Sequence, residues 1–224
     1  MANTEGEPRR LAKPKLTKRR CLPFTRKIAL PEPSPIPMSF ILALAERRSA
    51  ERFASIDLSD LATWLYYCST VQSVHSDDRN RQQRFVASFG ALHPAHILLG
   101  NPDGKWFTYV SGEHALGELA VDANVAFQLR NLAAQLFAAP EATLVSLISD
   151  TELAESYYEN ASGLILRDAG VLLGHGALVA AAIGIGFRIL GSTGGPLLEK
   201  MVCDLPFRAM ATGLAWIGGR KYVT

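Results

Sequence analysis

One long apolar segment organises this sequence: residues 164–185 read LILRDAGVLLGHGALVAAAIGI. The segment is apolar on every side of a helix and carries no formal charge between Asp168 and Arg188, a length that reaches the lower limit for a membrane-spanning helix. However, His175 and several glycines interrupt it, and no second span or aromatic belt accompanies it. We therefore predict a helix in the protein core or at a subunit interface, and no membrane association.

Predicted strands surround this helix. His96–Gly100 and Trp106–Val110 flank the turn sequence Asn101-Pro-Asp-Gly104, which predicts a β-hairpin. Residues 143–148, TLVSLI, predict a buried strand, and residues 209–217 predict a final strand.

Further helices are predicted by apolar residues at helical spacing. Ser39 is expected to cap a short helix over residues 38–47, and Ser59 is expected to cap a second helix. The remaining expectations are helices over residues 115–138 and 151–160 and an exposed polar loop over residues 72–84. This order of elements predicts an α+β fold rather than a doubly wound sheet.

Charge and proline are concentrated at the start of the chain. The 224 residues carry a formal charge of +2, yet residues 1–27 hold nine basic and two acidic side chains, and seven of the 12 prolines precede residue 38. We predict a basic, proline-rich arm over residues 1–37 and one domain over residues 38–224. The arm is expected to be a solvated tail that wraps its own subunit or a neighbour; an anionic partner and a targeting signal are the alternatives.

Several kinds of site are excluded or disfavoured by the motifs. The three cysteines are far apart and form no CxxC, which favours a reducing cytoplasm and no zinc site. His93 and His96 span a proline turn without other ligand types nearby, so we expect structural histidines and no metal. The pair Gly184-x-Gly186 follows a helix, whereas a dinucleotide fingerprint follows a strand.

Four segments carry groups that could bind an anion or a planar ring. Arginine and serine at a helix end provide charge-assisted recognition of phosphate, and glycines let backbone amides approach a ring. The segments are Arg47-Arg48-Ser49, Ser88-Phe89-Gly90, Ser192-Thr193-Gly194 within GSTGG, and Arg220-Lys221.

Their order and spacing resemble the nitroreductase family of FMN enzymes, in particular the azoline (thiazoline or oxazoline) dehydrogenase branch of the streptolysin and microcin maturation type. The resemblance covers residues 39–221. It is carried by the motifs RRSAERF, SFGALHPAHILLG, WFTYVSGEHALGEL, RDAG with the helix that follows it, GSTGG and GLAWIGGRK.

The resemblance implies a mixed sheet flanked by helices, a homodimer with the long apolar helix at its centre, and FMN at the subunit interface. Phosphate would be bound by Arg47, Arg48 and Ser49 with Arg220 and Lys221. The ring would be bound by Ser88, Phe89 and Gly90 with Ser192, Thr193 and Gly194. Hydride would pass through flavin N5, with NAD(P)H as a candidate electron donor and a modified peptide or a small organic molecule as substrate.

Two departures from the family pattern keep an alternative open. Glu51 stands where relatives place a basic phosphate contact, and the Lys-Tyr pair of azoline dehydrogenases is replaced before the long helix, where Tyr157 or Tyr158 could serve as the catalytic side chain. The alternative is a flavin-poor structural or activating subunit that works with a partner protein in a peptide-maturation complex. Nucleic-acid binding through the arm is the least favoured function.

Overall fold

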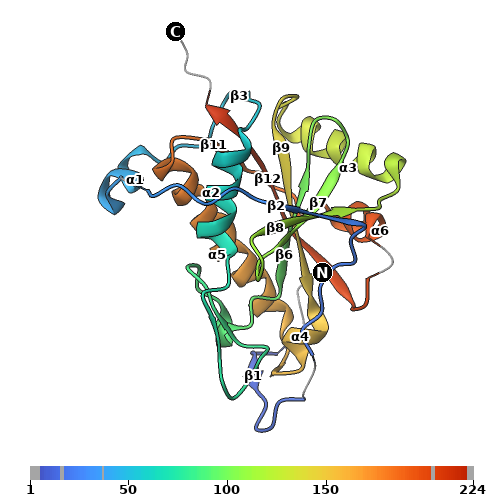
Figure 1. Cartoon of the computed structure of the whole chain (residues 1–224). Helices are drawn as coiled ribbons and strands as arrows, with labels where there is room; N and C mark the ends of the chain where they lie inside the picture. The colour runs from blue at the N-terminus through green and yellow to red at the C-terminus, as the bar shows by residue number, and fades with distance from the viewer. Residues whose placement is uncertain (1–5, 16–17, 37, 203–204, 221–224) are drawn as a thin grey trace.

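The computed structural model describes residues 6–15, 18–36, 38–202 and 205–220. A central sheet lies between two layers of helices (Figure 1). Its strands run in the order β11-β12-β9-β6-β7-β8-β2, and the short β3 pairs with β12 beside this path. The strands are β2 (Arg26–Ala29), β3 (Phe53–Ala54), β6 (Ala95–Gly100), β7 (Trp106–Val110), β8 (Ala115–Leu119), β9 (Thr143–Asp150), β11 (Gly186–Ile189) and β12 (Ala209–Arg220).

Every strand pair in the described part of the chain is antiparallel, so the sheet is not mixed as the resemblance implied. The physical reason is the connectivity: short turns join β6, β7 and β8, and short turns need antiparallel neighbours. The helical connections likewise return the chain in the opposite direction. The α+β class, with helices on both faces of a large sheet, is confirmed.

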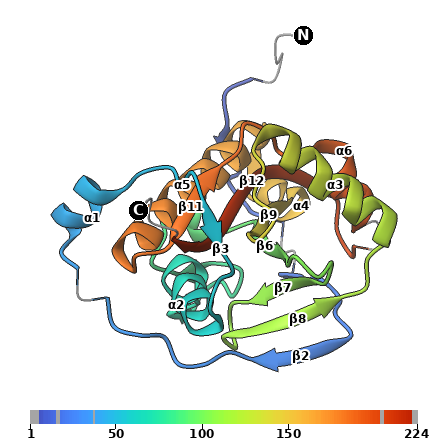
Figure 2. The same cartoon turned by 90° about the horizontal axis from the view of Figure 1, so that it is seen from above.

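The two faces of the sheet follow from the two-residue period of its strands. On β9, Val145 and Leu147 pack toward α2 and α5, whereas Leu144 and Ile148 pack toward α3 and α6. Figure 2 shows these layers from above. The helices are α1 (Phe40–Glu46), α2 (Leu58–Ser69), α3 (Ala123–Leu136), α4 (Thr151–Glu155), α5 (Ser162–Ala182) and α6 (Gly195–Met201).

The long apolar helix, α5, is a core helix of this domain. It alone among the described helices is long and apolar enough to cross a membrane by length and composition, yet half of its most apolar window is buried against the protein. The indole N–H of Trp64 on α2 donates to the carbonyl of Gly176. The helix ends where Gly184 adopts a φ of 77° and the amide of Ile185 donates to Ala180, the bonding pattern of a Schellman cap.

Four sequence predictions about local structure are wrong. Residues 115–119 form β8, not a helix, because pairing with β7 and β2 outweighs the helical preference of Ala and Leu. Asp57, not Ser59, caps α2 by accepting from the amide of Ser59. Helix α4 ends at Glu155, before Tyr158 and Glu159 (β10) pair with Arg9 and Arg10 (β1). Residues 72–84 are not a wholly exposed loop: Ser73–Val74 (β4) and Gln82–Gln83 (β5) pair, and Arg84 turns inward.

The described parts of the arm lie against their own domain. β2 extends the sheet as the neighbour of β8, and Phe24 packs so closely on Gly117 of β8 that a Cβ there would lie 2.6 Å from its ring. Leu22 is buried in the core. The described parts of the arm therefore supply an edge strand of the sheet and part of one wall of the folded unit.

Candidate functional site

The first candidate region lies where β11 begins. The amide of Ala50 donates to the carbonyl of Phe187 on β11, which fixes the segment after α1 at that point. Close by, Phe53 of β3 pairs with Arg220, the last residue of β12. The structure thus brings Arg47, Arg48, Ser49 and Arg220 to one edge of the sheet, and we call these four residues the cationic edge. Lys221 lies outside the described residues.

The side chains of the cationic edge differ in their contacts. The guanidinium of Arg48 donates to the carbonyls of Ala45 and Arg47, both at 2.8 Å, and so caps the end of α1. Arg47 is half-buried and Ser49 is exposed, as is Glu51. The side chains of Arg47, Ser49 and Glu51 are therefore all accessible to a ligand that approaches from solvent.

Sequence reasoning missed Arg188, which supports this region. Its guanidinium donates to the carbonyl of Ala50 at 2.9 Å and lies 3.9 Å from the ring centroid of Phe137. The sequence signal that could have identified Arg188 is that it is the single basic residue in the apolar strand β11.

The glycine turn Gly191–Gly195 lies at the other end of β11. Gly194 has a φ of 85° and is packed against Leu129 and Leu198, so glycine is required there by both conformation and space. Ser192 and Thr193 accept from the amides of Gly194 and Gly195. Their hydroxyls hold the turn in shape, while Thr193 and Gly191 are exposed.

The segment Ser88–Gly90 lies away from the cationic edge, beside the first half of α5. The amide of Phe89 donates to Asp168, and Ser88 accepts from the amide of His93. Gly90, Ala91 and His93 all have positive φ. For the two non-glycine residues this costs roughly 1–2 kcal/mol each, a strain of the kind that clusters at functional sites.

The two candidate tyrosines lie against this segment. Tyr158 packs edge-on against Phe89, with ring centroids 5.5 Å apart, and its hydroxyl lies over Gly90. Tyr157 is buried and donates to Asp78 at 2.5 Å, while the side-chain amide of Asn80 donates to the hydroxyl of Tyr157. Burial first, and then the bond to Asp78, raises the pKa of Tyr157, which does not favour it as a base at neutral pH.

Within one chain the candidate residues fall into two sets. The cationic edge lies near the end of α5 and Ser88–Gly90 lies beside Asp168. Fifteen residues of helix separate Asp168 from Ile183, which is about 22 Å at 1.5 Å per residue. One ligand the size of a mononucleotide cannot touch both sets in a single copy of the chain.

A group of titratable residues that the sequence did not single out lies inside the protein near Ser88–Gly90. We call Arg19, Arg84, His93 and Asp168 the buried polar cluster. Burial, together with nearby Arg19, lowers the pKa of Arg84 to about 9. Burial, with Arg84 and Arg19, lowers the pKa of His93 to about 3, so this imidazole is neutral at physiological pH. Burial raises the pKa of Asp168 to about 6, against hydrogen bonds from Ser88 and Phe89 that lower it.

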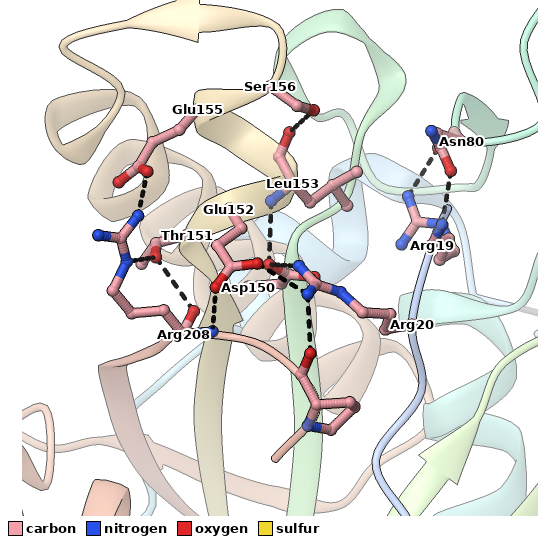
Figure 3. Close-up of polar contacts among 11 residues, drawn as sticks. Arg19, Arg20, Asn80, Asp150, Thr151, Glu152, Leu153, Glu155, Ser156 and Arg208 are labelled. Carbon is pink, nitrogen blue, oxygen red and sulfur yellow. Dashed lines mark hydrogen bonds and ion pairs between the residues drawn. The ribbon is translucent and has the colours of Figure 1, made fainter. Parts of the chain in front are cut away.

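Two arginines of the arm hold this region together (Figure 3). Arg19 donates to the carbonyls of Asn80, Leu92 and His93. Arg20 pairs with Asp150 and Glu152 at 3.2 and 2.7 Å. Asp150 in turn caps α4 by accepting from the amide of Leu153.

No protein-family model matches this sequence, and no curated protein matches it. Solved structures do resemble it. A protein described as a nitroreductase from Ralstonia eutropha JMP134 superimposes with a TM-score of 0.65 at 20% identity, over 96% of this chain and 100% of that one. A chain of the E. coli microcin synthetase McbBCD, bound to truncated pro-MccB17, gives a TM-score of 0.62 at 16% identity over 79% and 70%.

A third structure, NfrA2 of B. megaterium, gives a TM-score of 0.54 at 14% identity, over 82% of this chain and 67% of that one. These likenesses extend over most of the chain, and at such identities they concern the arrangement of helices and strands. The protein has the nitroreductase fold.

Proposed function

We propose that the protein is an FMN-dependent oxidoreductase that transfers hydride through flavin N5. The observation that carries the proposal is the position of the cationic edge and the glycine turn at opposite ends of β11, within a fold shared with nitroreductases. Phe187 and Ser192 are five residues apart, which is at most about 17 Å of extended chain. A phosphate at one end and a ring at the other suit that spacing.

The donor set fits the cofactor. Arg47, Ser49 and Arg220 would hold the phosphate, because guanidinium and hydroxyl groups bind it by charge-assisted hydrogen bonds. Arg48 would add its positive charge while its guanidinium caps α1. Backbone groups of Ser192, Thr193 and Gly194 would face the ring. When bound, the flavin supplies the redox chemistry, and these residues bind and orient it and exclude water.

A homodimer would complete this site. Phe40 and Ile41 on α1 are 67% and 73% exposed, and Leu166 and Val171 on α5 are nearly half exposed. Such an exposed apolar surface is typical of an interface. A two-fold axis across α5 would set two antiparallel copies of the helix together, and the segment Ser88–Gly90 of the second copy would then lie beside the cationic edge of the first. Tyr158 would accompany that segment as the candidate catalytic side chain.

The substrate, donor and location follow as further parts of the proposal. A modified peptide or a small organic molecule would be the substrate, and NAD(P)H is a candidate electron donor. The protein would act in the cytoplasm and would bind neither a membrane nor nucleic acid. The specific azoline-dehydrogenase role is supported by the structural likeness to a chain of the microcin synthetase McbBCD, which was solved with truncated pro-MccB17 bound.

The visible absorption spectrum of the purified protein tests the proposal, followed by heat release and mass identification of the chromophore. We expect one FMN per chain and turnover of NAD(P)H with an azoline or nitro substrate. A colourless protein that takes up no added FMN would overturn the proposal.

That colourless result would support the second candidate function, a structural or activating subunit of a peptide-maturation complex. Glu51 beside the cationic edge and the use of Arg48 as a helix cap favour it, because both weaken phosphate binding. Association with a partner protein, measured by co-purification of the pair, would then be expected.

The dimer is tested by Val171→Arg. Val171 is exposed in one copy of the chain, so the substitution leaves the fold of that copy intact but buries an unpaired charge in the proposed interface. We expect a folded monomer without flavin, measured by light scattering and absorbance. A Phe127→Arg variant on the exposed side of α3 is the matched control and should remain dimeric. Ala181, which is also on α5, does not suit this test: it is buried within one copy of the chain, so an arginine there would disrupt the fold itself.

A further inference from the structure

A cavity opens where two neighbouring strands of the sheet diverge. Pairing between β6 and β7 ends at Leu98 and Thr108, although β6 stays paired with β9 down to Ala95 and β7 with β8 as far as Val110. The arm residues Arg19–Leu22 cover this split. The resulting cavity measures about 230 Å³, far more than the 10–15 Å³ that one water needs.

Buried positive charge lines this cavity. Arg84 reaches it from the end of β5 and Arg19 from the arm. The guanidinium of Arg84 donates to Ser69 and Gln82 at 2.7 and 2.6 Å, and both partners are neutral. The Nε atoms of Arg84 and Arg19 are buried and have no hydrogen-bond partner in the part of the chain that the structure describes.

Within the described residues, no carboxylate lies within ion-pair distance of Arg19 or Arg84. The acidic side chains nearby have closer partners: Glu113 is paired with Lys27, Asp150 with Arg20, and Asp168 accepts from Ser88 and Phe89. Asp168 acts on Arg84 only from beyond ion-pair distance. His93 contributes no charge because it is neutral. A buried cation without a counter-ion in contact is costly, so the field inside the cavity favours an anion.

We propose that this cavity binds the carboxylate or phosphate group of a small molecule, with Arg84 and Arg19 as its cationic contacts. The planar guanidinium fork suits such oxyanions, and the hydroxyl of Ser69 on the cavity wall, which accepts from Arg84, keeps its own proton to donate. Leu22 and Ile97 provide apolar walls for the rest of the molecule. This site is separate from the proposed flavin site and stands without it.

We would test the site by isothermal titration calorimetry of the full chain at constant ionic strength. Inorganic phosphate is the ligand in one titration and acetate in the other. We expect saturable binding of at least one of them, and the tighter ligand identifies the oxyanion that the site prefers. Arg84→Gln should weaken that binding at least tenfold. The matched control is Arg130→Gln, because Arg130 is also partly buried but, among the described residues, donates only to backbone carbonyls of Gly100, Pro140 and Ala142, away from the cavity.

Thermodynamic linkage provides the second measurement. At an anion concentration 100 times the dissociation constant, the equilibrium constant for unfolding should fall about 100-fold in the wild type and in Arg130→Gln. If Arg84→Gln does not fold, Arg84→Lys keeps the charge but loses the fork, and it should bind about tenfold more weakly than the wild type. Absence of saturable binding in both titrations, or unchanged binding by the Arg84 variants, would overturn the proposal.

Discussion

The cationic edge and the buried polar cluster both use arginine, at opposite ends of α5, in opposite surroundings. Arg47 is half-buried and Ser49 exposed, so these side chains remain within reach of solvent. Arg19 and Arg84 are enclosed, and burial lowers the pKa of each. The comparison teaches that arginine at an open edge costs the fold little and can recruit a ligand, whereas enclosed arginine affects the stability of the fold itself.

The largest effect is expected at Asp150, the counter-ion that Arg20 has and Arg84 lacks. Asp150 is 1% exposed, and burial raises its pKa even beside Arg20. Asp150→Ala should lower the free energy of unfolding by roughly 2–5 kcal/mol, because Arg20 then keeps only Glu152 as its ion-pair partner and α4 loses its cap. Urea unfolding measures this. Glu155→Ala, which breaks the exposed pair with Arg208, should cost below about 1 kcal/mol; equal losses would contradict the comparison.

The next effect concerns His93 and acid. Its folded pKa of about 3 lies below the ordinary 6.5, so the unfolded chain binds more protons between these values and stability falls as the pH drops from 6.5. His93→Asn removes this loss and tolerates the positive φ at this position. Between pH 7.5 and 4.5 the wild type should lose roughly 3 kcal/mol relative to the variant. If the thermal stability of the wild type and that of His93→Asn change with pH in the same way, the lowered pKa of His93 is contradicted.

Asp168 should act in the opposite direction. Its folded pKa of about 6 exceeds the ordinary 3.8, so the folded chain binds more protons between these values and stability falls as the pH rises through them. Asp168→Asn removes that cost while its amide oxygen still accepts from Phe89. From pH 4.5 to 7.5 the variant should gain about 2 kcal/mol on the wild type. A constant difference across this range would show that Asp168 is not perturbed.

The smallest effect on stability is expected at the cationic edge. Arg47→Ala should change the free energy of unfolding by no more than about 0.5 kcal/mol. Under the proposed function it should nevertheless weaken FMN binding about tenfold or more, because a hydrogen bond to a charged group contributes roughly 1.5–3 kcal/mol. Fluorescence titration with FMN measures this. The control is Arg26→Ala, an exposed arginine paired with Glu118, which should bind FMN like the wild type.

Elements with a strong local pattern could be predicted from the sequence. The hairpin of β6 and β7, the buried strand β9, the last strand β12 and the helix α5 are confirmed. The strand Ala115–Leu119 could not be predicted, because its Ala and Leu residues favour a helix and only pairing with β7 and β2 makes it a strand.

The sites show the same limit. Composition identified segments rich in arginine, serine and glycine, but not which end of α5 each one would reach. Arg84 follows a polar run that is typical of an exposed loop. It is enclosed because β6 and β7 diverge and the arm covers the split, and both causes depend on residues far away in the sequence.

The pairing of β2 with β8 has a consequence for shortened forms of the chain. Without residues 1–37, β8 would become the outermost strand, with the backbone groups that now bond to Arg26–Ala29 left open and Gly117 uncovered. Exposed strand edges of this kind associate with one another and seed aggregation. Loss of function or a change in oligomeric state after removal of the arm would therefore report a damaged sheet edge, and the basic arm is better studied by charge-neutralising substitutions than by deletion.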